Sequence, residues 1–361
     1  MTRARQNANV TAAVGRNMVI NSAMNVAQRS ASVTGIGANY GGYFTVDRWR
    51  IYAENGAGRL TMTQTADGPN GISANCIKLD CTTADASIAA GEILLLKQTF
   101  EGQNLQRIGS GVAGAKQITV SFYVKASAGF TFGCELDNHD NTRQCTKLFD
   151  TTTDWVRHEI TFPADVDDGS SPFDDDNAAS LALNFWLHAG TTYTGGTLNT
   201  AAFANNTNAN RAVGIDSFFS NTNNNFFLTG VQLEVGPVAT EFEQEDFGVT
   251  LAKCMRYYEK QIADDGKFIA VGYNESTSLG RGIVHFKVRK RAAPTVTDSG
   301  THFAAFSTGA TGNAADCGFG GISLECAEWQ VTNSNATLVD GGGCLLHSKV
   351  DGAFVQADAE L

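Results

Sequence analysis

Apolar and polar residues alternate along much of the first two thirds of the chain. The clearest stretch is 118–125, in which every second side chain is apolar: Ile118, Val120, Phe122 and Val124. A period of two places these side chains on one face of a β-strand and the intervening polar ones on the other. The same alternation predicts strands in four further ranges: 60–65, 156–162, 181–187 and 227–235.

Many short strands separated by polar turns predict an antiparallel β-sandwich over residues 17–243. Its first strand is expected at Met18 to Val26, and Gly236-Pro237 ends its last strand. Of the known sandwiches, a jelly roll is expected.

The pattern changes after residue 243. Leu251, Cys254, Met255 and Tyr258 recur at three- and four-residue spacing, which predicts a helix over 247–261. Shorter alternating stretches rich in Gly, Ala, Ser and Thr follow it. The expected fold is therefore all-β, with four parts: an arm (1–16), the jelly roll (17–243), a connector helix (244–262) and a small Gly-rich β-sandwich (263–361).

Composition narrows the function classes. A formal net charge of −11 argues against a nucleic-acid partner, because phosphate binding needs clustered Lys and Arg. The longest apolar runs are too short to cross a membrane. The eight cysteines form no C-x-x-C pair, so the expectation is buried free thiols in a chain assembled in a reducing cytoplasm.

The N-terminal arm is basic. Arg3, Arg5 and Arg16 precede the first acidic residue, and the segment lacks the apolar run of a secretory signal. One interpretation is an arm that docks on an acidic partner. The other is a frayed chain end.

The predicted outer face of one strand suggests a glycan site. Asn184, Trp186 and His188 stand opposite apolar neighbours, and Tyr123 and Lys125 stand opposite the apolar face of another strand. An aromatic ring can stack on a sugar while amide and imidazole groups bond its hydroxyls. The alternative is that Trp186 is buried in a subunit interface or under the long loop 190–225.

An acidic loop between two strands offers oxygen ligands of the kind that calcium prefers. Its carboxylates do not follow the EF-hand spacing, so a solvated loop is the competing interpretation. The candidate ligands are Asp165, Asp167, Asp168, Asp174, Asp175 and Asp176. No other cofactor is expected.

Catalytic motifs are missing from the sequence. Its six histidines are scattered, and neither H-E-x-x-H nor G-x-S-x-G occurs. The expectation is a protein that is not an enzyme.

Three segments carry a resemblance to a known family. Residues 230–243 read G-V-Q-L-E-x-G-x-x-A-T-x-F-E, which resembles a closing signature of tailed-phage fibre and receptor-binding proteins. Residues 17–29 and Asp47-Arg48-Trp49 resemble that family's opening markers, and the ending 357–361 resembles a frequent fibre ending. Residues 17–24 and 226–233 also resemble the first and last strands of jelly-roll carbohydrate-binding modules.

The resemblance implies a bacteriophage virion protein, namely a homotrimeric short tail fibre or receptor-binding protein that adheres to glycans on the host surface. The arm would dock to other virion proteins and the C-terminal domain would form the tip. A capsid decoration or head-fibre protein is the alternative. A polysaccharide depolymerase is a third possibility, although the long β-helix repeat of such enzymes is missing from the sequence.

Overall fold

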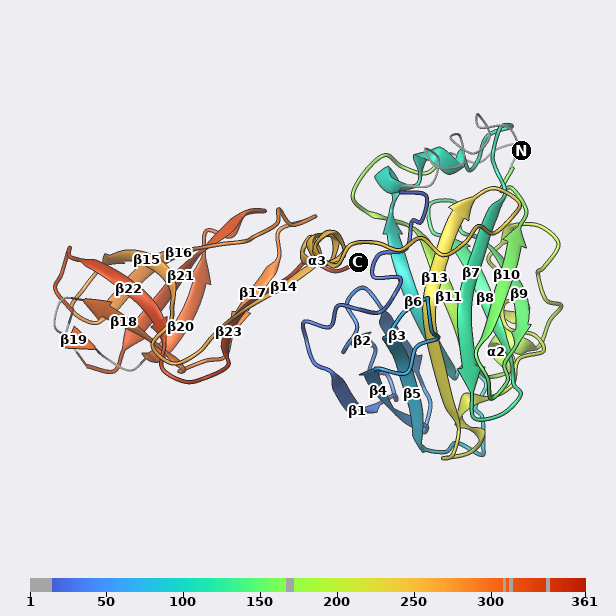
Figure 1. The fold of residues 1–361 in the computed structure, drawn as a ribbon, viewed down its shortest axis with the longest axis horizontal. Helices are drawn as coiled ribbons and strands as arrows, with labels where there is room; N and C mark the ends of the chain where they lie inside the picture. The colour runs from blue at the N-terminus through green and yellow to red at the C-terminus, as the bar shows by residue number, and fades with distance from the viewer. Residues whose placement is uncertain (1–14, 167–171, 308–309, 312–313, 336–337) are drawn as a thin grey trace. The chain divides into compact units, whose positions relative to one another are not determined.

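The computed structural model describes residues 15–166, 172–307, 310–311, 314–335 and 338–361. The chain forms two compact units. The first runs to Leu251 and includes Leu361, and the second covers Ala252–Glu360. Figure 1 shows both as sheets of antiparallel strands.

The first unit contains two antiparallel sheets. Sheet A has the order β1 (Ser32–Ile36), β4 (Arg59–Thr65), β5 (Cys76–Thr83), β13 (Asn225–Val235), β7 (Ile118–Ala126) and β10 (Val156–Phe162). Sheet B has the order β12 (Ala204–Asn205), β9 (Arg143–Asp150), β8 (Thr131–Asn138), β11 (Ala179–Ala189), β6 (Ile93–Glu101), β3 (Arg50–Glu54) and β2 (Gly42–Tyr43).

The chain crosses repeatedly between these sheets. It passes from β5 to β6, back to β7, over to β8, and back again from β9 to β10. This alternation between two antiparallel sheets makes the unit a jelly-roll β-sandwich. The expected all-β fold is therefore confirmed.

The core lies between sheets A and B, as the alternation predicts. Two sets of inward-pointing side chains meet there, and each is at most 3% exposed: Ile118, Val120, Phe122 and Val124 of β7, and Leu181, Leu183, Phe185 and Leu187 of β11. Phe122 from sheet A meets the edge of Phe185 from sheet B, with ring centroids 5.0 Å apart.

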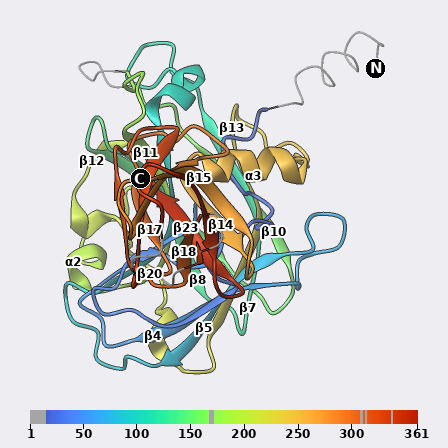
Figure 2. The same cartoon turned by 90° about the vertical axis from the view of Figure 1, so that its left-hand side faces the viewer.

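Residues 190–224, between β11 and β13, contain short elements: α2 (Thr191–Thr194), η3 (Asn208–Asn210) and η4 (Phe218–Ser220). They cover part of the outer face of sheet B, where Tyr193, Ala212 and Ile215 pack with Trp186. In Figure 2, α2 lies on one margin of the first unit and β10 of sheet A on the opposite margin. Two further turns, η1 (Gly102–Asn104) and η2 (Gln106–Ile108), follow β6.

The expected first strand is wrong. Residues 18–26 contain a turn at 20–23 and are otherwise irregular, although Met18, Val19, Met24 and Val26 are buried. Asn21 has a positive φ of 57°, and its side-chain amide bonds to the N–H and carbonyl of Val26. This local hydrogen bonding replaces the strand ladder.

The expected helix is too long. Helix α3 spans Phe247–Met255, and Tyr258–Ala263 is strand β14. All six residues of β14 pair with β23 (Ala353–Asp358). This long-range pairing overrides the helical spacing that extends to Tyr258.

The second unit also has two sheets. Sheet C has the order β14, β23 and β17 (Thr295–Asp298). Sheet D has the order β19 (Ala310–Thr311), β18 (Phe303–Ser307), β22 (Gly343–Ser348), β15 (Phe268–Asn274), β16 (Leu279–His285), β21 (Cys326–Asn333) and β20 (Ala314–Gly320).

Trp329, Phe303 and Val284 from sheet D share one core with Val296 and Val355 from sheet C, which makes this unit a small β-sandwich. Within the described residues, the only α-helices are α2 and α3, and neither is long and apolar enough to span a membrane.

Candidate functional site

A line of polar side chains crosses the outer face of sheet B. Strand pairing places each of its members directly opposite the next. Paired residues on neighbouring strands point to the same face, and the alternate residues of each strand lie in the core. We call this line the polar row, and its members in strand order are Tyr43, Arg50, Lys97, Asn184, Glu135 and Thr146.

Two cations adjoin each other in the polar row. Arg50 on β3 is paired with Lys97 on β6, and both side chains are half-buried. Neither makes a hydrogen bond or ion pair with any residue that the structure describes, and Arg50 Nε is buried without an acceptor. The ring of Tyr52 lies 5.9 Å from the Arg50 guanidinium carbon. Like charges directly opposite on a sheet destabilise it, so this arrangement is costly.

The other half of the row is fully bonded around Glu135, which is 0% exposed. Its carboxylate accepts hydrogen bonds from Asn184 Nδ2 at 2.8 Å and from Trp186 Nε1 at 2.9 Å. Arg211 donates to Glu135 through Nε and Nη2 at 2.8 Å each. The same Arg211 also reaches Asp137 at 2.7 Å. Both carboxylates are therefore ion-paired with the same guanidinium, that of Arg211.

Asn184 stands between the bonded half and the two cations. Its Nδ2 is used by Glu135, while its Oδ1 is buried and lacks a hydrogen-bond donor among the described residues. The residue is 1% exposed. A buried amide oxygen without a partner costs free energy unless something supplies a donor.

Burial and neighbouring charges shift the pKa values of this face. Burial lowers the pKa of Lys97; of the charges near it, Asp137 and Glu135 raise this pKa and Arg50 lowers it. Burial, and then the charge of Glu135, raise the pKa of Asp137. Burial also lowers the pKa of His139. Such shifts are common where a protein keeps charged groups for function.

Trp186 is not the exposed platform that the sequence suggests. Its side chain is 0% exposed, packs 5.4 Å from the ring of Tyr193 and lies under the guanidinium of Arg211 at 5.2 Å. The loop alternative considered from the sequence is the correct one. Gly133 is paired with Trp186, and a Cβ at position 133 would make tight contacts with Trp186 Cβ at 3.2 Å and Thr146 Cγ2 at 3.3 Å.

His188 is also closed off. It is 0% exposed, with Nδ1 at 2.8 Å from Ser217 Oγ and Nε2 at 2.9 Å from Glu92 Oε2. These contacts hold residues 217–219 against the end of sheet B. Of the three predicted residues on β11, only Asn184 belongs to the polar row.

Tyr123 and Lys125 lie on β7 of sheet A, so they face the opposite side of the sandwich. Lys125 pairs with Asp67 at 2.8 Å and lies over the rings of Trp155 (5.2 Å) and Phe227 (4.7 Å). The predicted five-residue glycan platform is therefore not one site.

The predicted calcium ligands are not brought together. Asp165 is buried and bonded to Arg143 at 2.9 Å and Asn138 at 2.9 Å, while Asp174, Asp175 and Asp176 are exposed. Asp167 and Asp168 lie outside the described residues. No group of three or more acidic, His or Cys side chains with metal-binding geometry occurs in the part of the chain described.

Arg16 does not belong to a free arm. Its Nη2 donates to the carbonyl of Glu241 at 2.8 Å, and its Nε lies 3.8 Å from Glu234. Arg3 and Arg5 lie outside the described residues, so their predicted role in attachment stays a prediction.

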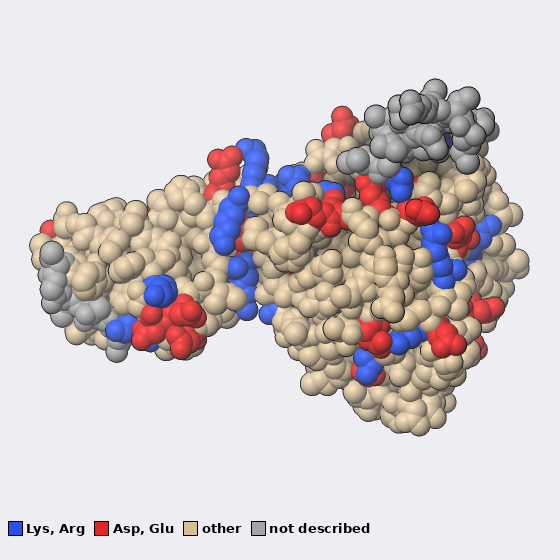
Figure 3. Space-filling model, in the orientation of Figure 1, with Lys and Arg blue, Asp and Glu red and all other residues tan. Residues whose placement is uncertain are grey.

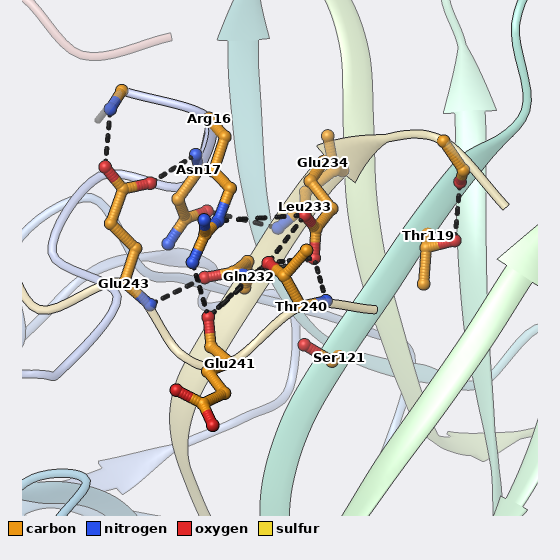
Figure 4. Close-up of polar contacts among 12 residues, drawn as sticks. Arg16, Asn17, Thr119, Ser121, Gln232, Leu233, Glu234, Thr240, Glu241 and Glu243 are labelled. Carbon is orange, nitrogen blue, oxygen red and sulfur yellow. Dashed lines mark hydrogen bonds and ion pairs between the residues drawn. The ribbon is translucent and has the colours of Figure 1, made fainter. Parts of the chain in front are cut away.

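The signature over 230–243 forms a second polar cluster, drawn in Figure 4. Glu243 accepts the backbone N–H of Asn17 at 2.9 Å, and Gln232 Oε1 accepts the backbone N–H of Glu243 at 2.8 Å. Thr240 donates through its N–H and its hydroxyl to Glu234, each at 2.8 Å. The side-chain oxygen of Asn17 accepts the backbone N–H of Leu233 at 3.1 Å, which completes the cluster. We call these five side chains the clasp: Asn17, Gln232, Glu234, Thr240 and Glu243.

The clasp holds both ends of the first unit together. It folds the chain after β13 back onto sheet A and fastens residues 15–17 beside it. The polar groups of the clasp are hydrogen-bonded within the protein, whereas Arg50 and Lys97 of the polar row have no hydrogen-bond or ion-pair partner among the described residues. The signature is thus a structural closure, and the polar row is the stronger candidate for binding.

All eight cysteines are free thiols, as expected. Six of them are buried, and burial raises the pKa of Cys76 and Cys81 to about 11.

No family model matches this chain, and no curated protein matches it significantly in sequence. Several solved structures of carbohydrate-binding modules are similar to it. One is a CBM22-1 xylan-binding domain from Paenibacillus barcinonensis, with 14% identity, coverage of 58% of this chain and 94% of that one, and a TM-score of 0.26. Another is a family 11 module from Clostridium thermocellum in complex with a mixed-linked tetrasaccharide, with 11% identity, 58% and 98% coverage, and a TM-score of 0.27.

A third similar structure is a CBM61 module in complex with β-1,4-galactotriose, with 10% identity, 61% and 99% coverage, and a TM-score of 0.29. With TM-scores below 0.5 these likenesses support no argument of their own. The jelly roll is established by the strand pairing of this chain.

Sequence reasoning missed Arg50, Lys97, Glu135, Asp137 and Arg211. A weak signal existed for Lys97, because this charged residue directly follows the continuous apolar run 93–96. No sequence pattern shows that Arg50 lies opposite it, because the two residues are 47 positions apart and their register is set by the sheet.

Proposed function

We propose that this protein is a glycan-binding adhesin of tailed-phage particles, a short tail fibre or receptor-binding protein, and that it binds host surface glycans through the polar row. The observation that supports this most is a sheet face on which two cations, Arg50 and Lys97, and the side-chain oxygen of Asn184 lack partners among the described residues. Such groups cost stability in the unbound protein, and sugar hydroxyls can satisfy them.

The surroundings of the row suit a sugar. Tyr52 and Tyr193 are half-buried beside it and offer ring surface for C–H groups. Loop residues such as Arg211 border the row, and loops of this kind provide specificity on a rigid scaffold. Figure 3 draws one face of the molecule, on which acidic side chains lie beside basic ones.

The virion role is supported by the resemblance of the clasp segment to fibre signatures. In that role the protein is a homotrimer, its N-terminal arm attaches to other virion proteins, and three weak sites give useful avidity. Adhesion without catalysis is the proposed activity.

The glycan part is tested with the purified chain on an array of bacterial surface polysaccharides. Asn184→Leu replaces the amide of a row member by an apolar group of similar branching, and we expect it to reduce binding at least about tenfold. Trp155→Leu on the outer side of sheet A is the control and should bind normally. Absence of binding to every glycan by the unmodified protein would reject the proposal.

The virion part needs a separate measurement. Mass spectrometry and immunogold labelling of purified phage particles from the source culture should detect the chain at the tail. Labelling of the head surface would favour capsid decoration, and a chain found only outside particles would remove the virion role.

A further inference from the structure

We infer that the sugar bound by the polar row is acidic and that its carboxylate sits between Arg50 and Lys97. This inference rests on the proposed glycan binding and adds the chemical class of the ligand. It would distinguish this chain from a binder of neutral polysaccharides.

The first argument is charge. Arg50 and Lys97 are directly opposed on adjacent strands, and neither has an ion-pair partner among the described residues. Opposed cations cost stability unless an anion separates them. A carboxylate placed between them would remove that cost on binding.

The second argument is that no described carboxylate forms an ion pair with either cation. Glu135 and Asp137 are already bonded to Arg211, and Glu54 accepts the hydroxyl of Tyr52. No ion pair joins Arg50 or Lys97 to these or to any other described carboxylate. The two cations are therefore available to an anion from outside.

The third argument is geometry. Arg50 offers a planar fork that fits the two oxygens of a carboxylate, and Lys97 offers a mobile ammonium. The next member of the row is Asn184, whose Oδ1 lacks a donor. A sugar acid carries a carboxylate and adjacent hydroxyl donors on one ring, so a uronic or nonulosonic acid matches this order of groups.

The test uses the full-length protein and pairs of glycans. Each bacterial polysaccharide that contains a uronic or nonulosonic acid is presented in its natural form and after reduction of its carboxyl groups to alcohols. We expect binding to the natural form and a loss of at least about tenfold after reduction. The loss should shrink as salt is raised, because ion pairs at a half-buried surface are screened.

Three variants assign the effect to the row. Lys97→Met and Arg50→Met should each weaken binding to acidic glycans at least about tenfold. Lys78→Met is the matched control, since Lys78 lies on the outer face of sheet A and pairs with Asp80 at 2.9 Å. It should bind like the unmodified protein.

Lys97→Glu provides a sharper test. A glutamate there faces Arg50 but also lies near Asp137 and Glu135, so thermal melts check that the variant is folded. It should reject acidic glycans and keep any binding to reduced ones.

The outcomes separate the two proposals. Equal binding of natural and reduced glycans overturns the acidic class and leaves glycan binding in place. Binding of acidic glycans that survives Lys97→Glu and Arg50→Met places the acid elsewhere and also overturns this inference. Failure to bind any glycan rejects the proposed function itself.

Discussion

The carboxylate of Glu243 accepts the backbone N–H of Asn17 at 2.9 Å, across 226 positions of sequence. This single side chain ties the beginning of the jelly roll to the segment that follows its last strand. This closure explains the polar residues of the signature segment. Gln232 accepts the backbone N–H of Glu243, and Glu234 accepts the backbone N–H of Thr240.

Glu243→Ala should therefore loosen the first unit. Removing the acceptor leaves the N–H of Asn17 without its partner, which should lower the free energy of unfolding by about 1–3 kcal/mol. Urea denaturation and amide hydrogen exchange at Asn17 measure the effect. Glu241→Ala is the control, because Glu241 is exposed and contributes its carbonyl to Arg16. Equal stability of the two variants would contradict a contribution of the Glu243 side chain to the stability of the first unit.

Trp186 is expected to act on stability. Trp186→Ala empties a fully buried site between β11 and the covering loop, and large-to-small changes of this type cost about 3–5 kcal/mol. Trp155→Ala should cost less, because Trp155 is half-buried. Intrinsic fluorescence during urea unfolding measures both. A Trp186→Ala protein of unchanged stability would show that the ring is not part of the core.

The second unit contains a buried ion pair that can be tested in the same way. Lys290 Nζ lies 2.6 Å from Glu259 Oε2, and both side chains are at most 1% exposed. Lys290→Met leaves the carboxylate of Glu259 buried without its cation, which should cost about 3–5 kcal/mol.

Pairing that change with Glu259→Leu should recover stability, because an apolar pair of similar volume often replaces a buried ion pair without loss. The exposed Lys267→Met serves as the control and should be nearly neutral. A double variant less stable than Lys290→Met alone would contradict this account.

The second unit should also lose stability in mild acid. Burial lowers the pKa of His347 from its usual 6.5, and His347 Nε2 is buried without a hydrogen bond among the described residues. As pH falls from about 6.5 toward that lowered pKa, the unfolded chain takes up a proton that the folded chain refuses. Stability is therefore complete above that range and decreases as pH falls through it.

His347→Phe should flatten this dependence, since a phenyl ring can pack between Phe268 and Phe306 as the imidazole does. Thermal melts at pH 7.5 and pH 5.0 compare the variant with the unmodified protein. An unchanged difference between the two pH values would assign the acid sensitivity to other groups.

Much of the fold could be predicted from the sequence because alternation is a local property. Residues 118–125 reveal a half-buried strand without any knowledge of the rest of the chain, and enough such strands predict a sandwich. The structure of residues 18–26 could not be predicted in this way, because their apolar side chains are buried although their backbone forms no strand. The end of α3 could not be predicted from the local pattern either. The helix stops before β14, and β14 is a strand because it pairs with the distant β23.

The candidate site shows the same division. From the sequence alone, Asn184, Trp186 and His188 can be placed on the outer side of one strand. The folded chain adds that residues 190–224 cover Trp186 and His188, that Tyr123 and Lys125 face away, and that Arg50 stands opposite Lys97. The reason is physical: the face of a side chain follows from a period of two within one strand, whereas its cross-strand neighbours depend on sheet order and register, which distant segments set together.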